Sequence, residues 1–219
     1  ITLESENGPA KCIIDCEKMN ETRGFNFHSG ETLLSVLDGF TIQNGNSVSG
    51  GGIACSNSSP KIINNIITSN SGSDGGGIYC AYSSPTIGNN TITGNSAVSA
   101  GGGIYCLEYS SPLIDNNIIS KNKSGSGGGI GLWKHLTHPS ITNNTIIENF
   151  ATSDGGGINC SWEAIKIDGN IITKNVTNSS GGGISNATSS VTITNNIISE
   201  NSANLYGGGI SCDGANINN

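Results

Sequence analysis

The chain has 219 residues, of which 33 are Gly, 34% are hydrophobic and only 11% are charged. Nine basic and 16 acidic side chains give a net charge of −7 without any basic cluster, which argues against nucleic-acid binding. No apolar run approaches the ~20 residues of a membrane-spanning helix, and the 5% of aromatic residues are too few to fill a thick globular core.

Two parts of different regularity follow one another along the chain. Residues 1–49 contain strand-like segments such as Ile1-Thr2-Leu3, and we expect them to form irregular first coils. Residues 50–219 are a regular repeat in which Gly-Gly-Gly-Ile or its equivalent recurs at steps of 25, 26, 26, 28, 26 and 26 residues. The copies begin at Gly50, Gly75, Gly101, Gly127, Gly155, Gly181 and Gly207.

Apolar residues within each copy alternate with a period of two, which predicts short strands and no helix. Five of the seven copies place Ile and Cys on one face after the Gly triplet, and two further Ile columns follow. The columns are Ile62, Ile87, Ile114, Ile141, Ile167 and Ile193, and then Ile67, Ile92, Ile119, Ile146, Ile172 and Ile198. Three short strands per ~26 residues predict one coil of a parallel β-solenoid with coils ~4.8 Å apart, stabilised by stacking.

Asn pairs separate the second and third strands of most copies, as at Asn64-Asn65 and Asn116-Asn117, and Gly169-Asn170 replaces the pair once. Exchange of Asn and Gly at the first position predicts a left-handed backbone conformation there. We expect the second Asn of each pair, and a further column that includes Asn70 and Asn122, to stack as amide ladders.

Five of the seven cysteines, Cys55, Cys80, Cys106, Cys160 and Cys212, occupy one repeat position. Leu132 replaces Cys in the fourth copy, so the column is expected to point inward. In-register side chains point parallel to one another, which favours free buried thiols over disulfides. No His or second Cys accompanies each one, so we expect neither a metal site nor a cofactor.

Together these repeats resemble the secreted right-handed parallel β-helix proteins of the pectin-lyase-like superfamily. The segments Cys12-Ile13-Ile14-Asp15-Cys16 and Asp38-Gly39-Phe40-Thr41-Ile42 are similar to the first coils of many members. The pairing of Gly-Gly-Gly-Ile with Ile-x-x-Asn is more loosely similar to the repeats of polymorphic outer-membrane adhesins. The resemblance implies one all-β domain over residues 1–219, a right-handed, single-stranded parallel β-helix of about eight coils, with an extracellular or cell-surface location. It does not specify an activity, because this fold hosts lyases, hydrolases, adhesins and spacers.

Pectinase activity is not expected. Pectate lyases of this superfamily use a calcium-binding Asp cluster and a catalytic Arg, whereas the only Arg here, Arg23, has no clustered Asp beside it. Asp74 and Asp154 both precede Gly triplets but are three copies apart, so they are not expected to share a cation. The motifs of polygalacturonases are also absent.

The fourth copy breaks the repeat, because it is two residues longer and carries Trp133, Lys134, His135 and His138. Stacking should bring these residues beside the equivalent turns of other coils, which contain Tyr82, Glu108, Tyr109, Trp162 and Glu163. Glu108 and Glu163 would be ~9.6 Å apart along the axis, a spacing near that of inverting glycosidases. Three interpretations stay open for this edge patch: catalysis by Glu108, His135 and Glu163, ligand contact, or an ordinary ladder of surface charges.

A second candidate surface is the outward side of the third strands. It is flat, β-branched and uncharged, which is typical of a contact surface or simply of residues that suit strands. Its members are Ile66, Thr91, Ile118, Thr145, Ile171 and Ile197, with Thr68, Thr93, Ser120, Ile147, Thr173 and Ser199 two residues further on.

We therefore expect a non-enzymatic extracellular solenoid, adhesive or filament-forming, whose partner is a polysaccharide or cell-surface glycan. The alternative is a carbohydrate-active enzyme, a hydrolase or lyase, at the edge patch. Because neither end carries a visible cap, we expect that the chain is a piece of a longer protein or that copies self-associate end to end, and that Lys at Ile210 and Ile217 would suppress this.

Overall fold

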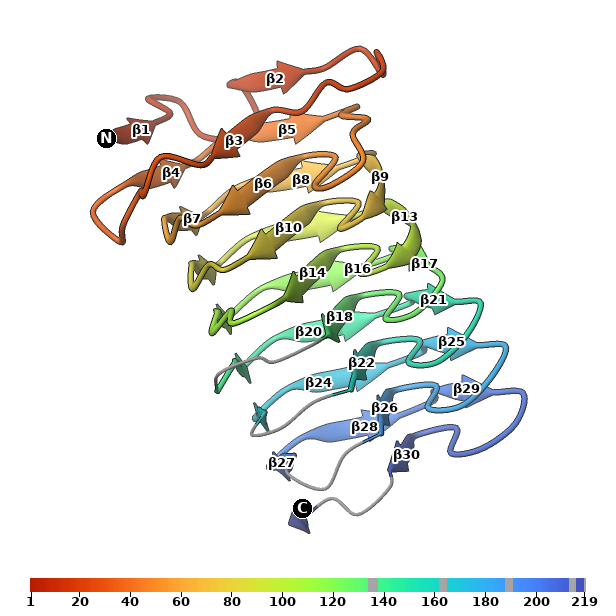
Figure 1. Cartoon of the computed structure of the whole chain (residues 1–219). Helices are drawn as coiled ribbons and strands as arrows, with labels where there is room; N and C mark the ends of the chain where they lie inside the picture. Colours follow the sequence, from red (N-terminus) through yellow and green to blue (C-terminus); the bar gives the residue numbers. More distant parts are fainter. Residues whose placement is uncertain (134–137, 162–164, 188–190, 213–215, 219) are drawn as a thin grey trace.

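The computed structural model describes residues 1–133, 138–161, 165–187, 191–212 and 216–218. These residues form a right-handed parallel β-helix of about seven turns with ~26 residues per turn, close to the number expected, and contain no helix. The coils stack from the N-terminus at the top of Figure 1 to the C-terminus at the bottom. Every pairing between strands of the four sheets is parallel, so each coil continues the sheets of the coil before it.

The polypeptide passes in each regular coil through sheets that we name D, A, B and C. Sheet D consists of β3 (Phe25–Phe27), β6 (Ile53–Ser56), β10 (Ile78–Ala81), β14 (Ile104–Leu107), β18 (Ile130–Trp133), β22 (Ile158–Cys160), β26 (Ile184–Asn186) and β30 (Ile210–Cys212). Sheet A consists of β1 (Thr2–Glu4), β4 (Val36–Asp38), β7 (Lys61–Ile63), β11 (Thr86–Gly88), β15 (Leu113–Asp115), β19 (Ser140–Thr142), β23 (Lys166–Asp168), β27 (Thr192–Thr194) and β31 (Asn216–Asn218). Sheet B consists of β2 (Ile13–Asp15), β5 (Thr41–Gln43), β8 (Ile66–Thr68), β12 (Thr91–Thr93), β16 (Ile118–Ser120), β20 (Thr145–Ile147), β24 (Ile171–Thr173) and β28 (Ile197–Ser199).

Sheet C is an addition to the three strands per coil that the sequence predicted. It consists of β9 (Ser71–Asp74), β13 (Ser96–Ala100), β17 (Lys123–Ser124), β21 (Phe150–Ala151), β25 (Val176–Thr177) and β29 (Ser202–Ala203). Its buried positions hold small residues such as Ala97, Ser124 and Ala151. Because no large apolar column marks these segments, the alternation that revealed the other strands is missing here.

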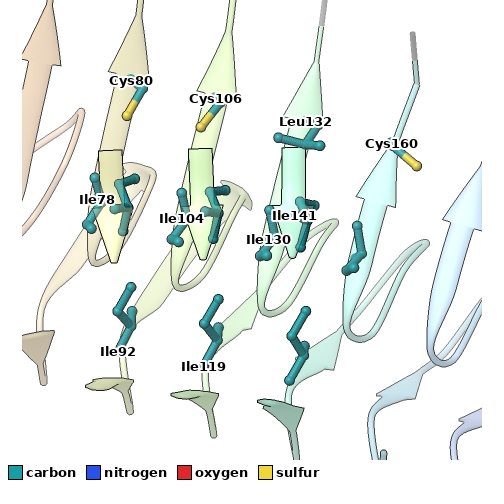
Figure 2. Close-up of a cluster of buried hydrophobic side chains, with 14 of the residues drawn as sticks. Ile78, Cys80, Ile92, Ile104, Cys106, Ile119, Ile130, Leu132, Ile141 and Cys160 are labelled. Carbon is teal, nitrogen blue, oxygen red and sulfur yellow. The ribbon is translucent and has the colours of Figure 1, made fainter. Parts of the chain in front are cut away.

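Isoleucine columns fill the interior, as predicted. Ile62 and its equivalents through Ile193 are fully buried, and so are Ile67 and its equivalents through Ile172. Figure 2 shows Cys80, Cys106, Leu132 and Cys160 at matching positions of successive sheet D strands, with Ile78, Ile104 and Ile130 beside them. Each fully buried Ile contributes about 1.5–3 kcal/mol of transfer free energy, and it does so only because the next coil covers it.

The cysteine column is also buried, and Cys12, Cys16, Cys55, Cys80, Cys106 and Cys160 are all free thiols. This agrees with the prediction of free thiols rather than disulfides. Removal from water raises the pKa of the Cys16 and Cys160 thiols, because the apolar surroundings disfavour the thiolate. These residues therefore act as small apolar side chains of the core.

Two buried asparagine ladders run parallel to the helix axis, as predicted. In the first, Asn117 Nδ2 donates to Ile87 O at 2.8 Å and to Asn144 Oδ1 at 3.0 Å, and Asn144 Oδ1 also accepts from the Asn117 amide at 2.9 Å. In the second, Asn122 makes the same contacts with Asn149 and Ile92. The ladders therefore satisfy backbone groups that the corners of the coil would otherwise leave buried without partners.

A left-handed residue precedes each ladder Asn, which confirms the prediction for the Asn pairs. The φ angle is +56° at Asn64, +55° at Asn116 and +69° at Gly169. In the second ladder, too, a left-handed residue precedes each Asn. There the residues are less suited to this conformation than Asn or Gly, since Lys121 and Glu148 each have a φ of +55°. These corners fix the direction in which the next strand leaves, and so they set the register of the sheets.

Candidate functional site

The predicted edge patch is described only in part. Tyr82, Glu108, Tyr109, Trp133 and His138 are among the described residues. The other members, Lys134, His135, Trp162 and Glu163, lie outside the described residues. Of the three candidate catalytic residues only Glu108 is therefore placed, and the prediction that Glu108, His135 and Glu163 act together stays a prediction.

Tyr82, Glu108 and Tyr109 come together at the turns that follow β10 and β14. Their φ angles are +52°, +44° and +54°, so all three lie in strained turn conformations. The two tyrosine rings stack with centroids 6.0 Å apart and an interplanar angle of 26°. The Tyr82 hydroxyl donates to the Glu108 carboxylate, and this hydrogen bond raises the pKa of Tyr82. Because the rings face each other, this cluster is better explained as a ladder between coils than as a free sugar platform.

Trp133 and His138 lie on either side of the lengthened turn of the fourth copy. Trp133 ends β18 in register with Leu107 of β14, and its side chain is 38% exposed. His138 is exposed, with a φ of +62°, directly before Pro139. β19 returns to register with β15, since Ile141 pairs with Ile114, so the extra residues are confined to the segment between Trp133 and Ser140.

Trp133 lines a pocket of about 190 Å³ on the outer face of sheet D. The opposite side of this pocket is formed where β9 and β13 end, at equivalent positions of successive coils: Asp74 pairs with Ala100, and Ala100 pairs with Ser126. The lining residues are Asp74, Ser99, Ala100, Tyr105, Ser126 and Trp133.

Gly131 makes room for the Tyr105 ring at the base of this pocket. The two residues pair across β14 and β18, and a Cβ at Gly131 would lie 3.1 Å from Tyr105 Cδ2 and 2.9 Å from the Gly101 nitrogen. The Tyr105 ring is therefore held against the sheet and is only 7% exposed. Tyr79 of β10 stands next to it, with ring centroids 6.1 Å apart.

The polar wall of the pocket is centred on Asp74. Burial raises the pKa of its carboxyl group, while hydrogen bonds from the Ser99 side chain and the Ala100 backbone oppose that shift. Burial also raises the pKa of the Tyr79 and Tyr105 hydroxyls, so both rings stay neutral. One wall thus carries a carboxylate with two serine hydroxyls, and the other carries Tyr105 and Trp133. Apolar rings facing a few polar groups are the usual composition of a small-ligand site.

A larger hollow of about 510 Å³ lies beside sheet C and the loop of Asn20 and Glu21. It is lined by polar residues of the segments 46–48, 71–73 and 96–98, together with Val48 and Val98. No aromatic ring is among its described lining residues. We favour the smaller pocket as the site, because it combines flat apolar surface with hydrogen-bonding groups.

Sequence reasoning identified Trp133 but missed Tyr79 and Tyr105. A signal was present: the residue between Ile and Cys of the repeat is Tyr in only two copies, whereas the other copies have Ala54, Gly131, Asn159 and smaller polar residues. Asp74 was considered only as a cation ligand paired with Asp154. Its actual neighbours come from the next coil, and the spacing of Gly triplets alone did not indicate them.

The second predicted surface lies where the sequence placed it. Thr91, Ile118 and Thr145 pair in register along the outer side of sheet B, and Ile118 is 49% exposed.

Within the described residues no group of three or more His, Cys, Asp or Glu side chains is arranged to hold a metal ion. No helix long and apolar enough to cross a membrane occurs in the part of the chain that the structure describes.

One family model matches part of this chain. Residues 29–132 match the model of a family described as "Protein of unknown function (DUF1565)", which is associated with β-helix proteins. Searches of curated proteins and of solved structures each gave no match. The matching segment includes Asp74, Ser99 and Tyr105 of the pocket and ends one residue before Trp133.

Proposed function

We propose that this protein is a non-enzymatic, extracellular β-solenoid that binds a glycan in the pocket between Asp74 and Trp133. The observation that carries the proposal is the pairing of two aromatic rings with a carboxylate and two hydroxyls around about 190 Å³. The apolar C–H face of a sugar ring packs on aromatic rings, while its hydroxyls need acceptors and donors at the rim. The volume is below the ~300–1,000 Å³ of pockets for drug-sized ligands, so it suits a single sugar ring.

The fold suits a protein that presents a binding surface to a glycan. A stacked solenoid holds its outer side chains on a rigid sheet, and a site on rigid elements needs little ordering when a ligand arrives. A longer glycan bound at the pocket would extend across neighbouring coils. Adhesion to a polysaccharide or to a cell-surface glycan is the activity that such a platform serves.

A panel of plant, algal and bacterial polysaccharides, tested by affinity electrophoresis and calorimetry, examines this proposal. We expect at least one polymer to bind and Trp133→Ala to weaken that binding by about tenfold or more, since a ring at the centre of a contact dominates its affinity. Tyr206→Ala is the matched control, because it removes an aromatic side chain that is 74% exposed and outside the pocket. Equal loss in both variants, or the absence of any binding polymer, would overturn the proposal.

The same incubations test the alternative, a carbohydrate-active enzyme. New reducing ends or unsaturated products that appear with the native chain and vanish with Glu108→Gln would favour catalysis at the edge patch. Binding without products is the result we expect.

A further inference from the structure

The pocket at Trp133 carries one carboxylate, that of Asp74, beside the hydroxyls of Ser99, Ser126 and Tyr105 and the indole N–H of Trp133. The Asp74 carboxylate only accepts, and two of its roughly four lone-pair positions are used by the Ser99 hydroxyl and the Ala100 backbone. Because the Ser99 hydroxyl donates its hydrogen bond to Asp74, the Ser99 oxygen also acts as an acceptor towards a ligand. The remaining lone pairs of the Asp74 carboxylate therefore need donors from a ligand, and sugar hydroxyl groups are such donors.

The charges around the pocket are negative. No basic residue is among its described lining residues. Glu108, which is not a lining residue, acts electrostatically on both Tyr79 and Tyr105, as Asp74 also does. A ligand carboxylate placed there would meet acceptors and like charge in a partly desolvated site, where repulsion is screened less than on the open surface.

We propose that this pocket selects neutral sugars over uronic acids, and that Asp74 is the residue that determines this selection by accepting hydrogen bonds from sugar hydroxyls. The inference rests on the proposed glycan binding and adds to it the class of sugar. It separates this chain from solenoids that recognise acidic polysaccharides, for which basic residues or bound cations are the natural partners of the ligand.

A matched pair of ligands tests the inference. The pair consists of the neutral hexose polymer that binds most tightly in the panel and the same polymer oxidised at C6, so that its primary hydroxyls have become carboxylates. Binding is measured at about pH 7.5 and at two salt concentrations, about 50 and about 500 mM. Salt screens the long-range repulsion from the net charge of −7 but screens a contact in the pocket less.

We expect the neutral polymer to bind at least about tenfold more tightly at both salt concentrations. Asp74→Asn should reduce this preference to about threefold or less, because it removes the negative charge that repels the oxidised polymer. The affinity for the neutral polymer should fall as well, since one acceptor oxygen is replaced by an NH2 donor, so the ratio of the two affinities is the readout. The control Asp154→Asn makes the same change of charge at the equivalent repeat position outside the pocket, and it should leave the preference unchanged.

Four results would overturn the inference. Equal affinity for both polymers, or a preference that Asp74→Asn does not alter, would remove Asp74 as the selecting residue. Binding only to polymers rich in uronic acid would leave the proposed glycan binding in place but reverse the selection, and would direct attention to Lys134, which follows Trp133 in the sequence. Failure of every polymer to bind would refute the proposed function and this inference together.

Discussion

The inner corner between sheets A and B and the outer face of sheet D follow opposite rules. At the corner the same residue types recur from coil to coil, as in the buried ladder of Asn117, Asn144 and Asn170. On the outer face, equivalent positions hold Ala54, Tyr79, Tyr105, Gly131, Asn159 and Ser185. Stacking dictates the first set, since each side chain must match its neighbours above and below. Stacking does not restrict the residue types of the second set. We therefore expect a binding site where these residue types vary from coil to coil.

The largest loss of stability should come from replacing a buried apolar side chain of one strand by a polar one. Ile119→Asn places an amide without partners in a fully buried position, and we expect a loss of about 4 kcal/mol or more from lost burial and desolvation. Ile118→Asn is the control, because this neighbouring side chain is 49% exposed and should cost less than about 1 kcal/mol. Urea unfolding followed by circular dichroism measures both, and equal losses would show that the inward and outward assignments are wrong.

A smaller loss of stability is expected in the Asn pairs, and it should differ between the two members of one pair. Asn144→Ala removes the acceptor of the Asn117 backbone amide, at 2.9 Å, and the donor to Ile114 O, also at 2.9 Å. Two buried groups lose their partners, so a loss of about 2–4 kcal/mol is expected. Asn143→Gly changes an exposed residue at a φ of +55° that Gly adopts readily, and should alter stability by less than about 1 kcal/mol. Unfolding curves that coincide for the two variants would contradict the ladder.

The smallest effect concerns a half-buried carboxylate at the end of β23. Hydrogen bonds from Thr194, Lys166 and Asn195 lower the pKa of Asp168 to about 2. Because this folded-state pKa lies below the unfolded value of about 3.9, the stabilisation is complete above that value and is lost as the pH falls through about 2. Carbon-detected NMR titration of the side chain should show the low pKa, and Thr194→Val should raise it. A titration near the ordinary value in the native chain would remove Asp168 from the contacts between coils.

Much of the fold was predictable because the physical constraint repeats. A buried Ile column or a left-handed Asn appears in nearly every copy, so each position is observed several times in one sequence. Sheet C escaped prediction because its inward residues, such as Ala97 and Ser124, are small and polar or weakly apolar. The edge patch was predicted from the one irregular copy, and of its members Trp133 reaches the pocket while Tyr82 and Tyr109 stack on each other.

The sequence by itself determined the solenoid, its inward columns, its free thiols and its Asn corners, because a two-residue period and a repeat of ~26 residues admit few other ways to bury isoleucine. Only the tertiary structure decided that Asp74, Ser99, Tyr105 and Trp133 share one pocket. These residues belong to four successive copies of the repeat and to two different sheets, and their meeting depends on where β9 and β13 end and on the space left by Gly131. The pocket depends both on the register between coils and on the volumes of the side chains. The period of the repeat predicts neither of these.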